Sequence, residues 1–189
     1  MNIGKLIIAL IGTALIVGAL LLYAGYEFPP INPPLQPFNV DEYVEAEEGQ
    51  LNQYVLTRTS LEASGGKYVE TPDEPPQLTI GPWDDLGIMK YTFDIPYTQE
   101  YYLWINVLWS DPEGDSYAIG WDIEVDLNNP EHWWDDSHIW TDSQYGTWHW
   151  ISRSTPLTTG THNLIFQTRE DGVALDVIYL STTPTFEPF

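Results

Sequence analysis

Apolar and polar residues alternate along several short segments of the sequence, and this alternation restricts the fold more than any other feature. The pattern is clear in residues 91–95, where Tyr91, Phe93 and Ile95 share one face. Similar patterns occur in five further segments, which are residues 101–109, 116–125, 147–152, 162–168 and 175–181. A period of two places alternate side chains on one face of a β-strand, whereas a helix requires a period near 3.6 residues. Because no convincing helical period follows Asp41, the chain after this residue is predicted to be all-β.

Turn-forming sequences separate these segments, for example SDPEGD at 110–115 and LNNPE at 127–131. The chain is also rich in tyrosine (12) and tryptophan (9), whose broad rings suit a pleated surface. Several segments are apolar on both faces, as expected when two sheets pack together. We therefore predict a two-sheet antiparallel β-sandwich over residues 41–183, followed by a short tail at 184–189.

An uncharged, mostly apolar segment extends from Leu6 to Tyr26. Its length matches the roughly 20 residues that a helix needs to cross a bilayer, and it exceeds the apolar region of a usual cleaved secretory signal. Lys5 precedes the segment, and acidic residues follow it. Residues 1–26 are therefore predicted to be a cytoplasmic stub and a single transmembrane helix in the inner membrane, with the C-terminal domain on the periplasmic or extracellular side.

Small residues lie along this predicted helix at Gly12, Ala14 and Gly18. Such residues let a second helix approach closely, which would place the chain among the subunits of a larger membrane assembly. Residues 27–40 are rich in proline and are predicted to form a stiff, extended spacer.

The net charge of −22 comes from 28 acidic and 6 basic residues. A surface of this charge repels phosphate backbones, so nucleic acid is excluded as a partner, whereas cationic partners and divalent metals are favoured. The chain has no cysteine, which excludes disulfides and thiolate metal sites.

Five pieces of the sequence, in this order, resemble the carbohydrate-binding modules of families 6 and 35. They are VEAEEG (44–49), ASGGKYVE (63–70), DIPYTQEYYLWINVLW (94–109), LTTGTHNLIFQTREDG (157–172) and LDVIYLS (175–181). The resemblance implies a jelly-roll β-sandwich of the galactose-binding-like class, covering roughly residues 40–182.

The resemblance also implies a structural calcium ion held by Glu45, Glu47 and Asp176, which match the acidic positions of the family. Calcium prefers such hard oxygen ligands. The alternative is that these are ordinary solvated acids in a very acidic protein. Family members usually have an asparagine two residues before the closing aspartate, where this chain has Ala174. Since alanine cannot form a side-chain hydrogen bond, this difference weakens the expectation that the usual sugar site is retained.

Aromatic residues that could contact a ligand or a protein partner are Tyr68, Trp83, Trp133, Trp134 and Trp140. The last three belong to a long, turn-rich connection, where exposed tryptophans would mark a contact surface. Trp148 and Trp150, by contrast, alternate on a predicted strand and are expected to face the core. We expect this turn-rich connection to contact a protein partner in preference to a sugar.

The sequence contains no catalytic motif such as G-x-S-x-G or H-E-x-x-H. The adjacent acid pairs Asp84/Asp85 and Asp135/Asp136 are typical of soluble surface loops, and the spacing of His132 and His138 is not diagnostic of a metal site. The chain is therefore predicted to be a non-catalytic, membrane-anchored accessory subunit that docks on the extracytoplasmic face of a larger assembly, such as a respiratory or photosynthetic complex or a surface filament. The alternative is a cell-surface carbohydrate-binding module that holds a polysaccharide.

Overall fold

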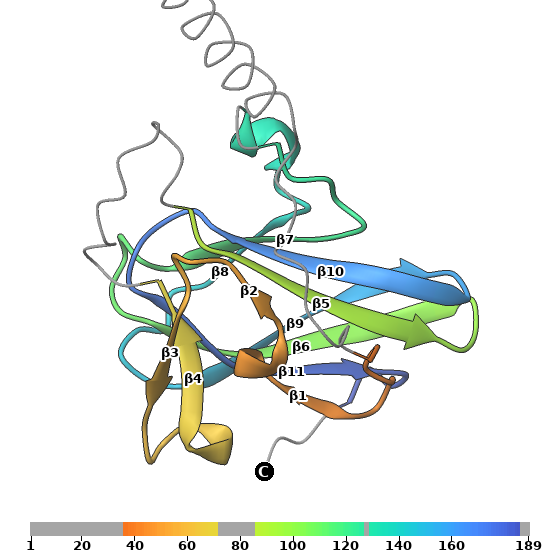
Figure 1. Cartoon of the computed structure of the whole chain (residues 1–189), viewed down its shortest axis with the longest axis horizontal. Coiled ribbons are helices and arrows are strands. Elements are labelled where there is room, and N and C mark those ends of the chain that lie inside the picture. The colour runs from red at the N-terminus through yellow and green to blue at the C-terminus, as the bar shows by residue number, and fades with distance from the viewer. Residues whose placement is uncertain (1–35, 72–85, 127–128, 186–189) are drawn as a thin grey trace, which may run out of the picture.

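The computed structural model describes residues 36–71, 86–126 and 129–185, and it contains two antiparallel β-sheets packed as a sandwich (Figure 1). The strands are β1 (Tyr43–Glu45), β2 (Gln50–Leu51), β3 (Leu56–Thr59), β4 (Lys67–Glu70), β5 (Ile88–Ile95), β6 (Gln99–Trp109), β7 (Ser116–Trp121), β8 (Ile139–Thr141), β9 (His149–Leu157), β10 (Gly160–Thr168) and β11 (Val173–Ser181). Three short 3₁₀ turns are present, η1 (Ala46–Glu48), η2 (Ser64–Gly66) and η3 (Pro130–Trp133).

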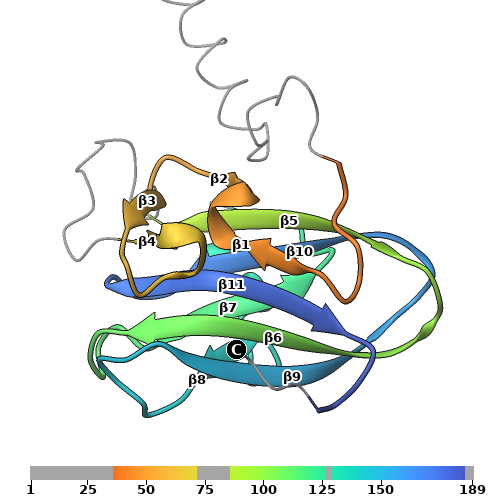
Figure 2. The same ribbon diagram turned by 90° about the horizontal axis from the view of Figure 1, so that it is seen from below.

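One sheet has the order β3-β4-β11-β6-β9, with β1 also paired to β11, and it is called the β11 sheet below. The other has the order β2-β5-β10-β7-β8 and is called the β10 sheet. Figure 2 shows β1, β11, β6 and β9 side by side on one face of the molecule. The predicted antiparallel β-sandwich is confirmed.

The core lies between the two sheets and contains the alternate residues that the sequence predicted. Tyr91, Phe93 and Ile95 of β5 are buried, and so are Ile105 and Trp109 of β6. Burial of each such side chain contributes about 1.5–3 kcal/mol relative to leaving it in water, so the period of two is also the pattern of greatest stabilisation.

The predicted strand at residues 116–125 is shorter in the structure, where β7 ends at Trp121. Asp122 follows with a φ of 55°, in the left-handed region that few non-glycine residues adopt. Its carboxylate accepts a hydrogen bond from the Asn163 backbone N–H at 2.8 Å and lies 2.7 Å from His162 Nδ1. This turn takes the chain out of the sheet, so Ile123 and Val125 are not strand residues.

The edge of β11 changes its partner halfway along the strand. Ala174 and Leu175 pair with β4, whereas Val177, Ile178 and Tyr179 pair with β1. The register with β6 shifts between Leu175 and Val177, which places Asp176 in a β-bulge. β1 and β4 therefore share one edge of β11, and Asp176 lies where one replaces the other.

Before β1, Phe38 pairs with Phe93 and exchanges backbone hydrogen bonds with Thr92 and Asp94, so the sandwich includes residues that the sequence assigned to the spacer. In the described part of the chain, no helix is long and apolar enough to cross a membrane. The predicted transmembrane helix, with Gly12, Ala14 and Gly18, lies outside the described residues.

Candidate functional site

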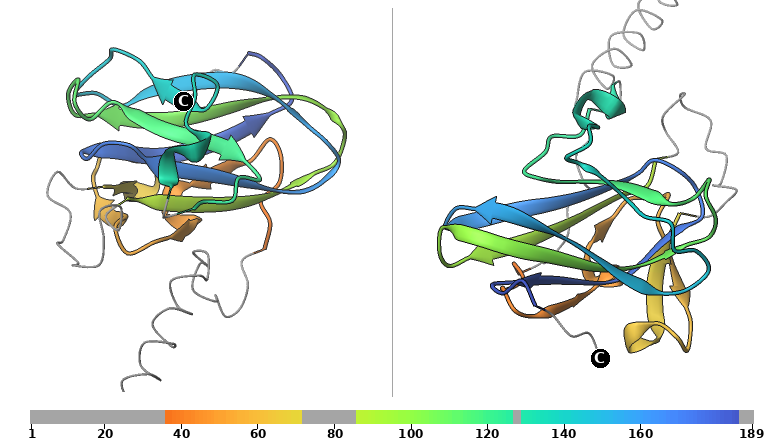
Figure 3. Two further views of the ribbon diagram at one scale, coloured as in Figure 1. Left: turned by 90° about the horizontal axis from the view of Figure 1, so that it is seen from above. Right: turned by 180° about the vertical axis from the view of Figure 1, so that it is seen from behind.

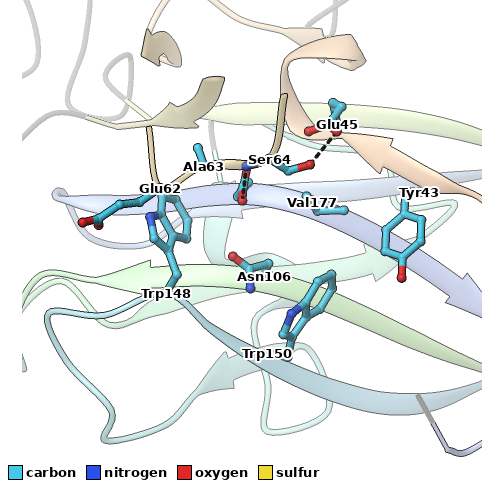
Figure 4. A pocket seen from close by; sticks show the side chains of 10 residues that line it. Tyr43, Glu45, Glu62, Ala63, Ser64, Asn106, Trp148, Trp150 and Val177 are labelled. Atoms are coloured by element: carbon cyan, nitrogen blue, oxygen red, sulfur yellow. Dashed lines mark hydrogen bonds between the residues drawn. The ribbon is translucent and has the colours of Figure 1, made fainter. Parts of the chain in front are cut away.

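A cavity of about 730 Å³ lies on the side of the β11 sheet that faces away from the core. Residues from five parts of the chain line it, namely β1, the connection before β4, β6, the start of β9 and β11 (Figure 4). Its main side chains are Tyr43, Glu45, Glu62, Asn106, Trp148 and Trp150, with Asp176 at its base.

Two tryptophan rings, Trp148 and Trp150, form one wall of this cavity (Figure 4). The residue between them, His149, points the other way and is only 8% exposed. Its ring packs edge-on against Trp109, and its Nε2 lies 3.2 Å from the carboxylate of Asp142. The prediction that Trp148 and Trp150 face the core is therefore wrong, because histidine fills the inner side of β9 at this point.

The phase of β9 was nevertheless present in the sequence. Leu157 is buried and Ile151 packs on the core. Both lie an even number of positions after His149, so all three share one face of the strand. These two aliphatic residues identify the inner face of the strand, whereas the tryptophans belong to the opposite face. Trp148 and Trp150 were predicted to face the core because of their size, whereas the position of the aliphatic residues in the strand places them on the outer face.

Aromatic neighbours hold the walls of the cavity in place. The ring of Tyr68 packs edge-on against Trp148 at a centroid distance of 5.4 Å, and Tyr179 packs against Tyr43 at 4.8 Å. Burial, together with the carboxylate of Glu70, raises the pKa of the Tyr68 hydroxyl. Tyr68, a predicted contact residue, does not line the cavity and instead supports Trp148 from behind.

Asn106 projects from β6 between the tryptophans and β11 (Figure 4). It is 8% exposed, and its side-chain amide has no hydrogen-bond partner within the described ranges. The amide atoms of Asn106 are not among the buried unpartnered atoms, so they reach the open cavity and are available to hydrogen-bond a ligand there. Asn106 is not among the predicted site residues, because a single asparagine within an apolar strand belongs to no recognisable motif.

The three predicted metal ligands lie in the same region. Asp176 is 4% exposed, and both its carboxylate oxygens accept a hydrogen bond from the Ser64 backbone N–H, at 3.1 and 3.0 Å. The Ser64 hydroxyl donates to Glu45 Oε1 at 2.8 Å. Burial raises the pKa of Asp176 to about 6; the Ser64 hydrogen bond opposes this, and the charges of Glu45 and Glu47 add to it.

The fit of a calcium ion to these acids is partial. Glu45 Oε2 and Glu47 Oε2 are buried and have no hydrogen-bond partner among the described residues, as expected for oxygens that await a cation. However, the described ranges contain no group of three or more acidic, histidine or cysteine side chains arranged to hold a metal. The type of donor fits calcium, while the spacing does not bring all three carboxylates to one point.

The predicted docking loop is largely packed against the protein. Trp133 is 7% exposed and donates a hydrogen bond from its indole N–H to Gln167 Oε1 at 3.1 Å. Trp140 is buried in the core with the Arg153 guanidinium 5.1 Å from its ring centre. Trp134 is half-buried.

The prediction that Trp133 and Trp140 form an exposed contact surface is therefore wrong. The short turn η3 lies over the β10 sheet (Figure 3), where the hydrogen bond from Trp133 to Gln167 of β10 holds it. Trp83 lies outside the described residues.

No protein-family model and no curated protein matches this sequence. Solved structures do match. A carbohydrate-binding module from Cellvibrio mixtus lichenase 5A, solved with cellotriose, matches with a TM-score of 0.51 and 18% identity over 76% of this chain and 98% of its own. A family 35 carbohydrate-binding module from Clostridium thermocellum matches with a TM-score of 0.52 and 13% identity, over 75% of this chain and 99% of its own.

An exo-β-1,3-galactanase from Phanerochaete chrysosporium, solved with β-1,3-galactotriose, matches with a TM-score of 0.53 and 13% identity. The match covers 75% of this chain but only 29% of the galactanase, so the chain is similar to one part of that enzyme. At these identities the similarity establishes the fold, which is the β-sandwich of the carbohydrate-binding modules of families 6 and 35.

Proposed function

We propose that this protein is a non-catalytic carbohydrate-binding module whose ligand lies in the cavity on the β11 sheet. The observation that carries this proposal is the wall formed by Trp148 and Trp150, which faces solvent beside the unpartnered amide of Asn106. The shared fold with sugar-binding modules supports it. The glycan-binding alternative thus becomes the preferred function.

The chemistry of the cavity suits a sugar. The C–H faces of a sugar ring are apolar and stack on aromatic rings, while its hydroxyl groups need hydrogen-bond partners such as an asparagine amide. A volume of about 730 Å³ lies in the range of small-ligand pockets.

The test is binding of the full chain to a panel of polysaccharides, followed by calorimetric titration with oligosaccharides of the best ligand. Trp148→Ala and Trp150→Ala should each weaken binding by about tenfold or more, since a stacking surface is lost. Tyr97→Ala is the matched control, because Tyr97 is 71% exposed and lies outside this cavity. Unchanged folding is checked by circular dichroism.

Two results would contradict this assignment. One is the absence of binding to every glycan on the panel. The other is binding that survives loss of both tryptophans but is lost in Tyr97→Ala, which would place the ligand near the turn that joins β5 to β6.

The accessory-subunit hypothesis has less support. It depends on the predicted anchor in residues 1–26, which lie outside the described residues, and on an exposed tryptophan loop, whereas Trp133 and Trp140 are buried. If the anchor is present, the module would hold its glycan near the membrane surface.

We also propose that calcium stabilises the fold by drawing Glu45, Glu47 and Asp176 together around the ion, since the three carboxylates do not already meet at one point. The support is the pair of buried, unpartnered oxygens on Glu45 and Glu47. When bound, the ion would neutralise charge that three acids concentrate beside β11 and would link the first strand to the last.

A further inference from the structure

We infer that the cavity on the β11 sheet prefers glycans that carry free amino groups, such as polymers of glucosamine, over neutral glycans. This inference rests on the proposed function and names the class of sugar that the site recognises.

The lining of the cavity is one-sided in charge. Glu45, Glu62 and Asp176 all line it, and no lysine, arginine or histidine does. Glu45 and Asp176 share the hydrogen bonds of Ser64, but the Glu62 carboxylate has no partner among the described residues. Even if a calcium ion neutralised Glu45 and Asp176, Glu62 would keep the mouth of the cavity negative.

Glu62 and Trp148 both line the cavity, and Figure 4 draws their side chains in the same part of it. A carboxylate next to an aromatic face is a favourable environment for an ammonium group, which gains both a charge interaction and a cation–π contact. A neutral sugar hydroxyl gains neither of these to the same extent. A glucosamine unit stacked on the tryptophans could use its ring for stacking and its ammonium group for the carboxylate.

Asn106 is an independent indication of a ligand at the same place. Its side chain lines the cavity, and no described residue hydrogen-bonds to its amide oxygen or nitrogen. The amide oxygen accepts hydrogen bonds from an ammonium group, which only donates. The cavity therefore combines an acceptor, a free negative charge and aromatic faces.

The charge of the whole protein acts in the same direction. At a net charge of −22, long-range attraction concentrates cationic polymers near the surface and repels uronic-acid or sulfated polymers. The preference should therefore show both in equilibrium affinity and in its dependence on ionic strength.

The test compares three β-1,4-linked hexasaccharides that differ only at C2, namely those of glucosamine, N-acetylglucosamine and glucose. Titrations use the full chain in mildly acidic buffer with calcium, so that the amines are protonated. The glucosamine hexamer should bind about tenfold more tightly than the other two, and this advantage should shrink as salt is raised.

Glu62→Gln should reduce the advantage of the glucosamine hexamer over the neutral hexamers by about threefold. Glu100→Gln is the matched control, because Glu100 is an exposed acid of β6 outside the cavity, and this variant has the same net charge as Glu62→Gln. An equal loss in both variants would mean that overall charge, not the cavity, selects the amine.

The two proposals fail in different ways. Equal affinity for the three hexamers, together with loss of binding in Trp148→Ala, would overturn the amine preference and leave the glycan site in place. An absence of binding to these and to every other glycan tested would overturn both. A preference for the amine that Trp148→Ala and Trp150→Ala do not alter would overturn the assignment to this cavity.

Discussion

Asp176 shows how much of this site depends on a single position. It is the residue of the β11 bulge, it is 4% exposed, and it accepts hydrogen bonds from the backbone of Ser64. The Ser64 hydroxyl reaches Glu45 in turn. One carboxylate therefore connects the last strand to the turn before β4, and that turn connects to the end of β1.

This carboxylate predicts a pH dependence of stability in the absence of calcium. Because burial raises the pKa of Asp176 to about 6, above its ordinary value of 3.8, the folded state holds the proton more tightly than the unfolded state. The corresponding stabilisation is fully present below pH 4 and is lost as the pH rises through 6. The loss for this group is on the order of 3 kcal/mol.

The measurement is the free energy of unfolding in denaturant, with chelator present, for the wild type and for Asp176→Asn. Between pH 4 and pH 7 the wild type should lose stability relative to the variant. Parallel pH profiles for the two proteins would show that Asp176 does not titrate in this interval.

At the scale of elements, the sequence predicted strands well and their faces less well. The alternation of β5 and β6 identified their core residues correctly, because one face of each strand is buried along most of its length. At the start of β9, Trp148 and Trp150 lie on the outer face, and His149 between them lies on the inner face and pairs with Asp142. A rule that assigns large aromatic residues to the core therefore fails for the strand that carries the site.

The pairing of β1 with β11 leads to a prediction about calcium. If the ion links these elements through Glu45, Glu47 and Asp176, chelation should lower the melting temperature by about 5–10 °C, because the ion binds only the folded state. Differential scanning calorimetry with and without chelator measures this.

Glu47→Gln should abolish most of the calcium response. Glu48→Gln provides its control, because Glu48 is the exposed next residue of the same turn and is not one of the proposed ligands. A melting temperature that is unchanged by chelator would remove calcium from the account of this fold.

At the scale of the whole molecule, the net charge of −22 opposes folding through repulsion among acidic groups. Added salt shortens the Debye length from about 30 Å at 0.01 M to about 8 Å at 0.15 M and so screens this repulsion. The melting temperature in chelator should therefore rise by several degrees over that range of sodium chloride. A constant or falling melting temperature would show that attractive charge pairs balance the repulsion.

The sequence by itself determined the fold class, because the period of two along each segment is a local property that dictates which residues can share a face. It also predicted Glu45, Glu47 and Asp176 as calcium ligands, through a family resemblance that the structural comparisons support at the level of the fold. Only the tertiary structure decided where the binding surface lies. Asn106, Trp148 and Glu62 come from distant parts of the chain. They line one cavity because β9 is next to β6 in the β11 sheet, and because the turn before β4 reaches over β11, the other neighbour of β6, where Ser64 hydrogen-bonds to Asp176. That order depends on packing between sheets and leaves no local pattern in the sequence.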